Sequence, residues 1–152
     1  MRKKENEITK KSIIETVIQK AAVCRLGLSD GNMPYVVPVC FGYRNNVLFI
    51  HSALRGMKID IIRRNKNVCF EVDINTEIVK AENGCNWGVN YQSVIGFGKA
   101  SFVEDIDEKR EALCLIMSHY SDKVFEFPDE VIKRTAIIKI EIETVTGKQA
   151  GC

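Results

Sequence analysis

The sequence predicts an α+β domain built on an antiparallel barrel of about six strands, flanked by three short helices. Patterns typical of helices interrupt runs of strand patterns instead of alternating with each strand. Tight turns such as Ser29-Asp30-Gly31-Asn32 join neighbouring strand patterns. No G-x-G-x-x-G opens a helix after a first strand, since Gly96-Phe97-Gly98 lies inside a strand pattern. A doubly wound parallel sheet is therefore disfavoured.

The first third of the chain predicts one helix and three antiparallel strands. Ser12-Ile13-Ile14-Glu15 has the spacing of a capping box, and apolar residues follow at helical intervals, which predicts a helix over about 12–21. The three strands are expected over 23–28, 35–43 and 47–51. Pro34 and Pro38 have no backbone N–H to donate to a neighbouring strand. Their strand must therefore be an edge strand, contain a bulge, or leave backbone groups available to a partner other than the sheet.

The remaining elements are predicted in the same way, from the helical spacing of apolar residues and from the alternation typical of strands. Helices are expected over 56–65 and 107–120, a polar loop over 80–86, and an irregular stretch around Pro128. Strands are expected over 68–79, 91–103 and 135–143. The glycines of the 91–103 strand permit the sharp curvature that closes a barrel.

The bulk properties indicate one globular domain, 1–152. The 152 residues are 45% hydrophobic and 28% charged, and the formal net charge of +2 is too small to argue for nucleic acid. No apolar run has the length of a signal peptide or a membrane span, so no membrane association and a cytoplasmic location are expected. Six cysteines without a C-x-x-C pair are interpreted as reduced thiols.

The segment from His51 to Lys58 is the strongest candidate for chemistry. A strand ends in small and polar residues, a glycine follows, and a helix begins with a lysine in its first turn. The free N–H groups of that turn and the helix dipole favour negative charge, and Lys58 adds an ammonium. Phosphate capture is the functional interpretation, and an ordinary surface loop is the alternative.

Other side chains could complete such a site. Tyr91 and Ser93 alternate on one face of a strand and could donate to a phosphate if that face meets it. His51 could be catalytic, as a proton donor. Alternatively, its ring could have the structural role of hydrogen-bonding the backbone at the end of a strand. With two histidines in the chain, no metal site is expected. Trp87 could stack on a planar ligand, or it could pack against other side chains of the protein.

Three further features have a structural interpretation that we favour. Cys40 could be a nucleophile, but no nearby base is evident, so a packing role is expected. The cluster Arg63, Arg64 and Lys66 is expected to form a solvated face. His119 is expected over the C-terminus of its helix, where a cation is favoured.

Taken together, these motifs resemble the flavin-binding split β-barrel proteins related to pyridoxamine 5'-phosphate oxidase, and within them the nitroimidazole-resistance branch. The likeness covers nearly the whole chain. It rests on the segments Arg25-Leu26-Gly27, Pro34-Tyr35-Val36-Val37-Pro38-Val39, His51-Ser52-Ala53 with Gly56 and Lys58, Val68-Cys69-Phe70-Glu71-Val72, and Tyr91-Gln92-Ser93-Val94-Ile95 with Gly98.

The resemblance implies a homodimer with two flavin sites at the subunit interface. It implies a phosphate held by His51, Ser52, Lys58 and Ser93, and an isoalloxazine ring lined by backbone around Pro38 to Phe41. The cofactor-binding residues that follow are Pro38, Val39, Cys40, Phe41, His51, Ser52, Ala53, Gly56, Met57, Lys58, Tyr91, Ser93 and Val94. Trp87 is the candidate substrate residue.

One departure from the family pattern narrows the function. Pyridoxamine phosphate oxidase itself uses an arginine and histidine pair near its C-terminus, which Thr144 to Cys152 does not contain, so vitamin B6 oxidation is not expected. The resemblance instead implies an FMN-dependent oxidoreductase, with FAD as the alternative cofactor. It would reduce a small electrophile such as a nitroaromatic or a quinone with electrons from a nicotinamide. The alternative is a flavin- or haem-binding module without turnover.

Overall fold

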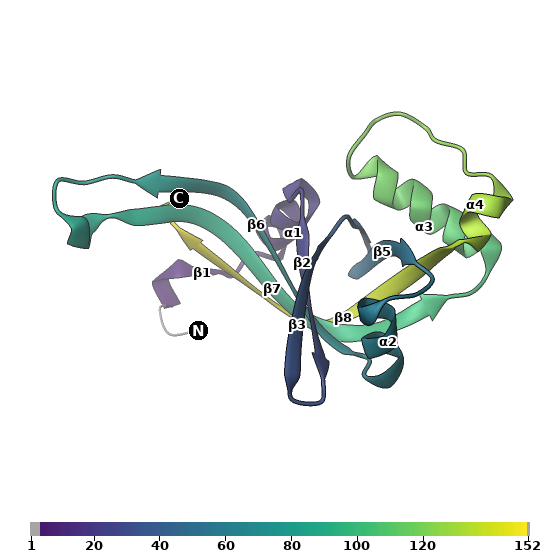
Figure 1. Ribbon diagram of the computed structural model, residues 1–152. Helices are drawn as coiled ribbons and strands as arrows, with labels where there is room; N and C mark the ends of the chain where they lie inside the picture. Colours follow the sequence, from purple (N-terminus) through teal and green to yellow (C-terminus); the bar gives the residue numbers. More distant parts are fainter. Residues whose placement is uncertain (1–3, 152) are drawn as a thin grey trace.

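The computed structural model describes residues 4–151, which form one curved antiparallel sheet with helices at its ends and margins (Figure 1). The strands are β1 (Glu7–Ile8), β2 (Cys24–Asp30), β3 (Met33–Val39), β4 (Gly42–Arg44), β5 (Val47–Ala53), β6 (Asn67–Val79), β7 (Gly88–Val103) and β8 (Thr135–Ala150). The α-helices are α1 (Lys11–Lys20), α2 (Met57–Arg64), α3 (Ile106–Ser118) and α4 (Asp129–Lys133), and short 3-10 turns cover Lys4–Asn6 and Gly84–Asn86.

The sheet is an open barrel. Its strand order is β3-β2-β6-β7-β8-β5-β4, with β1 paired to β8, and every pairing is antiparallel. Within residues 4–151, β3 and β4 at the two ends of this order do not pair with each other. The expected α+β class and antiparallel split β-barrel are therefore confirmed.

The long central strands bend around a single main core. Alternate residues of β6, β7 and β8 point inward, and they include Phe70, Val94, Ile138 and Ile140. The side chain of Phe70 occupies the space above Gly96, where an added Cβ would lie 2.2 Å from a ring carbon. A glycine there lets the ring close over β7, as expected from the strand's glycine content.

Helices cover the open parts of this sheet. Helix α1 packs against β6 and β7, α2 packs against β2, and α3 packs against β4 and β5. The hairpin of β6 and β7 extends away from the barrel as an arm, on the side opposite α3 and α4 (Figure 1). No helix within residues 4–151 is long and apolar enough to cross a membrane.

Residues 4–151 form eight strands, more than the expected six or so. The expected 35–43 strand divides into β3 and β4, because the chain leaves the edge of the sheet at Cys40 and Phe41 and β4 then pairs with β5. The last strand continues from 143 to Ala150, because its final residues pair with the start of β7 and with β1. Such pairings depend on distant partners and are weakly marked in local sequence.

Two helix predictions were also wrong in detail. The capping box at Ser12 does not form: α1 begins at Lys11, with Lys10 at the N-cap and no side chain capping it. The irregular stretch around Pro128 contains a fourth helix, α4, for which Pro128 takes the N-cap position. Its five residues are too few for helical periodicity to be visible in the sequence.

Candidate functional site

The turn from β5 to α2 forms the centre of the candidate site. β5 continues two residues beyond the expected end at His51, because Ser52 and Ala53 pair with β8. Gly56 occupies the N-cap of α2 with φ 131°, and an added Cβ would meet nothing within 4 Å. No side chain caps α2, so the first-turn N–H groups remain available to an anion.

Lys58 stands in the first turn of α2 as a half-buried cation. Partial burial lowers the pKa of its ammonium group below the ordinary lysine value. Within residues 4–151, no carboxylate lies within ion-pair distance of Lys58. A partly desolvated ammonium without a counter-ion, at the positive end of a helix dipole, favours binding of an anion.

The two histidines have different environments. Leu48 and Ile50 point into the barrel, whereas His51 is exposed on the outer face of β5. His119 is the C-cap residue of α3, as expected from its position near the helix end, and its Nε2 lies 2.7 Å from the carbonyl oxygen of Ala21. Its ring also packs at 4.4 Å from the ring of Phe41. His51 is therefore the more exposed of the two histidines.

Tyr91 and Ser93 lie on the outer face of β7. Val94 is fully buried and points inward, while Ile95 and Phe97 are 44% and 55% exposed, so the odd-numbered residues face outward. Tyr91 and Ser93 thus share one face, and only the backbone of Val94 could contact a ligand outside the barrel. Lys148 pairs with Ser93 across the strands, and its Nζ lies 5.8 Å from the centre of the Tyr91 ring.

Within one chain, Ser93 and the β5–α2 turn are not brought together. Helix α2 ends beside the far end of β2, where Arg64 pairs with Asp30 at 2.6 Å. Ser93 pairs with Asp73, which bonds Arg25 at the other end of β2. The two candidate phosphate-binding groups lie at opposite ends of the barrel.

The junction of β3 and β4 leaves backbone unused by the sheet. β3 pairs with β2 and lies at an edge of the sheet, which is one of the three alternatives that its two prolines allowed. Val39 and Phe41 are buried, and the Phe41 N–H donates to the Tyr120 hydroxyl at 3.1 Å. Cys40 between them is exposed, so the expected packing role for Cys40 is wrong.

Trp87 lies on the β6–β7 arm, 51% exposed, with its indole Nε1 donating to the carbonyl oxygen of Ala81 at 2.7 Å. It lies in the loop that joins β6 to β7, directly before the first residue of β7. The cysteines within residues 4–151 are all free thiols, and burial raises the pKa of Cys24 to about 12. Cys152 lies outside the described residues.

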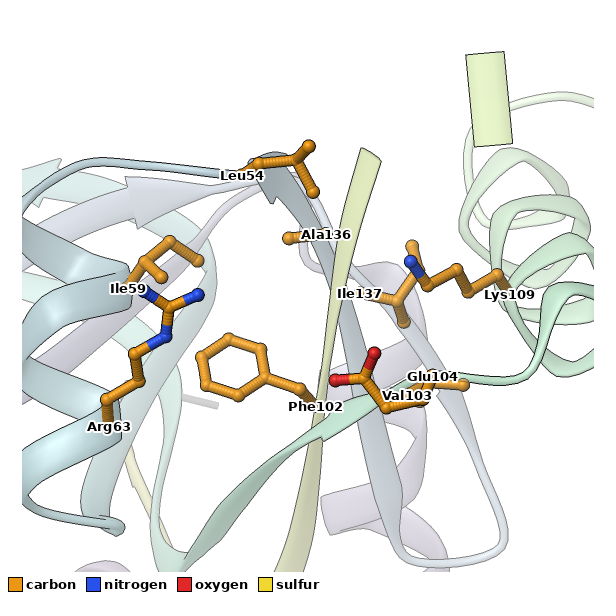
Figure 2. Close-up of a pocket in the computed structure, with 9 residues that line it drawn as sticks. All are labelled: Leu54, Ile59, Arg63, Phe102, Val103, Glu104, Lys109, Ala136 and Ile137. Carbon is orange, nitrogen blue, oxygen red and sulfur yellow. The ribbon is translucent and has the colours of Figure 1, made fainter. Parts of the chain in front are cut away.

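A small cavity adjoins the β5–α2 turn and was not predicted from the sequence (Figure 2). It has a volume of about 150 Å³ and is lined by Leu54, Ile59, Arg63, Phe102, Val103, Glu104, Lys109, Ala136 and Ile137. The Arg63 guanidinium lies 5.9 Å above the centre of the Phe102 ring. Four separate chain segments contribute to its wall, so no local motif could have indicated it.

Comparison with known proteins identifies the family. The model of the pyridoxamine 5'-phosphate oxidase family matches residues 10–149, which is nearly the whole chain. The chain belongs to this family. Among curated proteins, none matches the chain.

Several solved structures share the fold of this family member. A candidate 5-nitroimidazole antibiotic resistance protein from Bacteroides thetaiotaomicron is 36% identical, with a TM-score of 0.86 over 94% of this chain and 86% of that one. A flavocytochrome from Azotobacter vinelandii is 17% identical, with a TM-score of 0.85 over 97% of this chain and 71% of that one. An FAD and haem binding protein from Mycobacterium smegmatis is 15% identical, with a TM-score of 0.87 over 97% of this chain and 74% of that one. The last two show likeness of fold alone.

Proposed function

We propose that this member of the pyridoxamine 5'-phosphate oxidase family binds a flavin and uses it to reduce a small electrophile, such as a nitroaromatic or a quinone. The observation that carries the proposal is the half-buried Lys58 ammonium, which has no carboxylate partner within residues 4–151, at the uncapped N-terminus of α2. The 36% identical neighbour, associated with 5-nitroimidazole resistance, supports a nitroaromatic substrate. The cytoplasm, where free thiols stay reduced, suits the unpaired cysteines.

In this proposal, the chain holds the flavin phosphate from several directions. Lys58 and the first-turn N–H groups of α2 bind the phosphate, and Ser52 adds a hydroxyl from the end of β5. Gly56 lets the phosphate approach the backbone closely, because no Cβ projects from the N-cap. The half-buried setting of Lys58 strengthens the attraction relative to a fully solvated cation.

The open edge of the sheet suits the ring of the cofactor. The edge strand β3 and the Pro38 to Phe41 junction offer backbone that is not paired to a second strand. Backbone groups of this kind can hydrogen-bond the polar edge of an isoalloxazine ring and tune its electronics. When bound, the flavin would supply the hydride or electron transfer, and the exposed imidazole of His51 would position substrate or donate a proton.

We further propose that the flavin site is completed by a second copy of the chain. Ser93 and Lys58 lie at opposite ends of one barrel, so both can contact one phosphate only if they come from different subunits. The outer face of β7 around Ser93 carries exposed Ile95 and Phe97, an apolar patch of the kind that homodimer interfaces cover. A homodimer with two interfacial flavins accounts for both features.

Spectroscopy of the purified protein tests the proposal. The protein, as isolated or after incubation with FMN, is expected to show the visible absorption of bound flavin. Addition of reduced nicotinamide should bleach that absorption, and a nitroimidazole or quinone should restore it. Protein that binds neither FMN nor FAD would contradict the proposal. Bound flavin without acceptor-dependent turnover would support a binding module in place of an oxidoreductase.

A further inference from the structure

Lys148 lies beside Ser93 on the outer face of the sheet. Strand β8 pairs with β7 so that Lys148 is directly opposite Ser93. Directly opposed residues of an antiparallel pair share one face, with their Cβ atoms about 4.5–5.5 Å apart. Gly147, the preceding residue of β8, faces inward, where an added Cβ would lie 2.8 Å from the Cβ of Ile8. Lys148 therefore extends from the same outer surface as Ser93.

The side chain of Lys148 leans towards β7. Its Nζ lies 5.8 Å from the centre of the Tyr91 ring, a contact between a cation and an aromatic face. Tyr91 is two residues before Ser93 on the same face of β7, which places the two residues about 7 Å apart along the strand. The contact with Tyr91 thus holds the ammonium on the side of β8 where the Ser93 hydroxyl lies.

The positive charge of Lys148 is available to a ligand. The residue is half-buried, and within residues 4–151 no carboxylate lies within ion-pair distance of its Nζ. Glu7 on β1 is its cross-strand neighbour on the other side, yet Glu7 belongs to none of the ion pairs among the described residues. A half-buried ammonium in this setting favours an anion from outside the chain.

The acidic residues on the other side of Ser93 have a cation of their own. Asp73 lies opposite Ser93 on β6, and the Arg25 guanidinium hydrogen-bonds Asp73. Arg25 also donates to Glu71 at 2.9 Å. Arg25 is therefore held by carboxylates, whereas Lys148 is the cation beside Ser93 that no carboxylate of the described chain engages.

We propose that Lys148 of the partner subunit binds the flavin phosphate opposite Lys58, so that two lysines from different copies clamp one phosphate. The inference rests on the flavin site and the dimer proposed above, and it adds a binding residue to that site. A phosphate monoester carries a charge of about −1.5 to −2 at pH 7, so a second ammonium gains a strong charge-assisted hydrogen bond. Tyr91 acts as a positioning residue, because its ring holds the Lys148 ammonium near Ser93.

Titration of the flavin-free protein with FMN and with riboflavin tests the clamp. Riboflavin has the same ring as FMN but no phosphate. Lys148→Met keeps the apolar stem and removes the ammonium, so FMN binding should weaken about tenfold or more, as expected for a hydrogen bond to a charged group. Riboflavin binding should change by less than about twofold, because the lost contact is with phosphate. Lys148→Arg keeps the cation and should largely restore FMN binding.

A matched control comes from the same strand. Lys139 on β8 pairs with Glu141 at 2.8 Å, and Lys139→Met should change neither dissociation constant. Unchanged FMN binding in Lys148→Met, or equal weakening of FMN and riboflavin, would overturn the clamp while leaving a flavin site in place. Failure of the unmodified protein to bind any flavin would instead overturn the proposed function itself.

Mixed dimers show which subunit supplies Lys148. In a dimer of one Lys148→Met and one Lys58→Ala subunit, both losses fall on the same site, so one site should bind FMN with unmodified affinity. In a dimer of Lys148→Met and Ser93→Ala subunits, each site loses one residue, so no site of unmodified affinity should remain. The reverse pattern would place Lys148 and Lys58 of one subunit in the same site and would overturn the inference.

Discussion

Ser93 on β7 pairs with Lys148 near the end of β8, whereas Lys58 on α2 follows the end of β5, which pairs with the start of β8 at Thr135. Arg64, six residues after Lys58, pairs with Asp30 at one end of β2, and Asp73, the cross-strand partner of Ser93, bonds Arg25 at the other. In a site that contains both, each residue must come from a different copy of the chain. The proposed flavin site therefore requires the proposed dimer.

Mixed dimers provide the sharpest test of that arrangement. Lys58→Ala should weaken flavin binding by about 1.5–3 kcal/mol, the range for a hydrogen bond to a charged group, and Ser93→Ala should also weaken it. In a dimer of one Lys58→Ala subunit and one Ser93→Ala subunit, one site keeps both residues. We expect this dimer, purified through two different tags, to bind one flavin with unmodified affinity.

If Lys58 and Ser93 of the same subunit served one site, every site in the mixed dimer would be defective. Titration would then give no site of unmodified affinity, which would contradict the composite arrangement. Lys66→Ala mixed with Ser93→Ala is the control, since it should leave one unmodified site in a composite arrangement or in a single-chain one.

The affinity for FMN should depend on the protonation of Lys58. Burial lowers the pKa of its ammonium, and only the charged form attracts phosphate, so binding should weaken as pH rises through that lowered pKa. Isothermal titration from neutral to alkaline pH will measure this. In Lys58→Arg the side chain stays charged, so the affinity for FMN should no longer fall as pH rises. An equal fall in affinity in that variant would show that another group titrates.

The same shift predicts the pH dependence of stability without flavin. Because the folded pKa of Lys58 lies below the unfolded value, the unfolded chain binds more protons between the two. The contribution of Lys58 to the free energy of unfolding should therefore rise with pH across this window. Urea denaturation at several pH values will measure this. The free energy of unfolding should rise more steeply with pH across this window for the unmodified protein than for Lys58→Met.

The outer face of β7 should control dimer formation. Phe97→Glu places a charge within the exposed apolar patch, and we expect light scattering to show a monomer that has lost tight flavin binding. Val124→Glu is the matched control, since Val124 is 95% exposed on the loop after α3 and outside that patch. A Phe97→Glu protein that stays dimeric would show that the interface lies elsewhere.

Closure of the barrel over Gly96 should be sensitive to a single methyl group. An added Cβ would lie 2.2 Å from the Phe70 ring, so Gly96→Ala should reduce the free energy of unfolding by about 1–3 kcal/mol. At Gly88, an added Cβ meets nothing within 4 Å, and Gly88→Ala should be nearly neutral. Urea denaturation of the two variants compares them directly; similar values would contradict the packing described for Phe70.

Local patterns predicted much of the fold because they depend on near neighbours. The alternation along β7 correctly placed Tyr91 and Ser93 on one face, and the edge position of β3 is one of the three alternatives that its prolines allowed. The strand, glycine and lysine of the His51 to Lys58 segment correctly located the start of α2. In contrast, β8 was predicted too short, because its last residues are held by pairing with β7 and β1.

The sequence by itself determined the family and the residues with phosphate-binding chemistry. Tertiary structure decided which of those residues can meet, since sheet register places Ser93 and Lys58 at opposite ends of one barrel. It also created the cavity between Arg63 and Glu104, which are 41 positions apart in the chain. A motif records spacing along the backbone, whereas a binding site depends on distances across a folded sheet. Those distances are set by strand order and helix packing, to which every segment of the chain contributes.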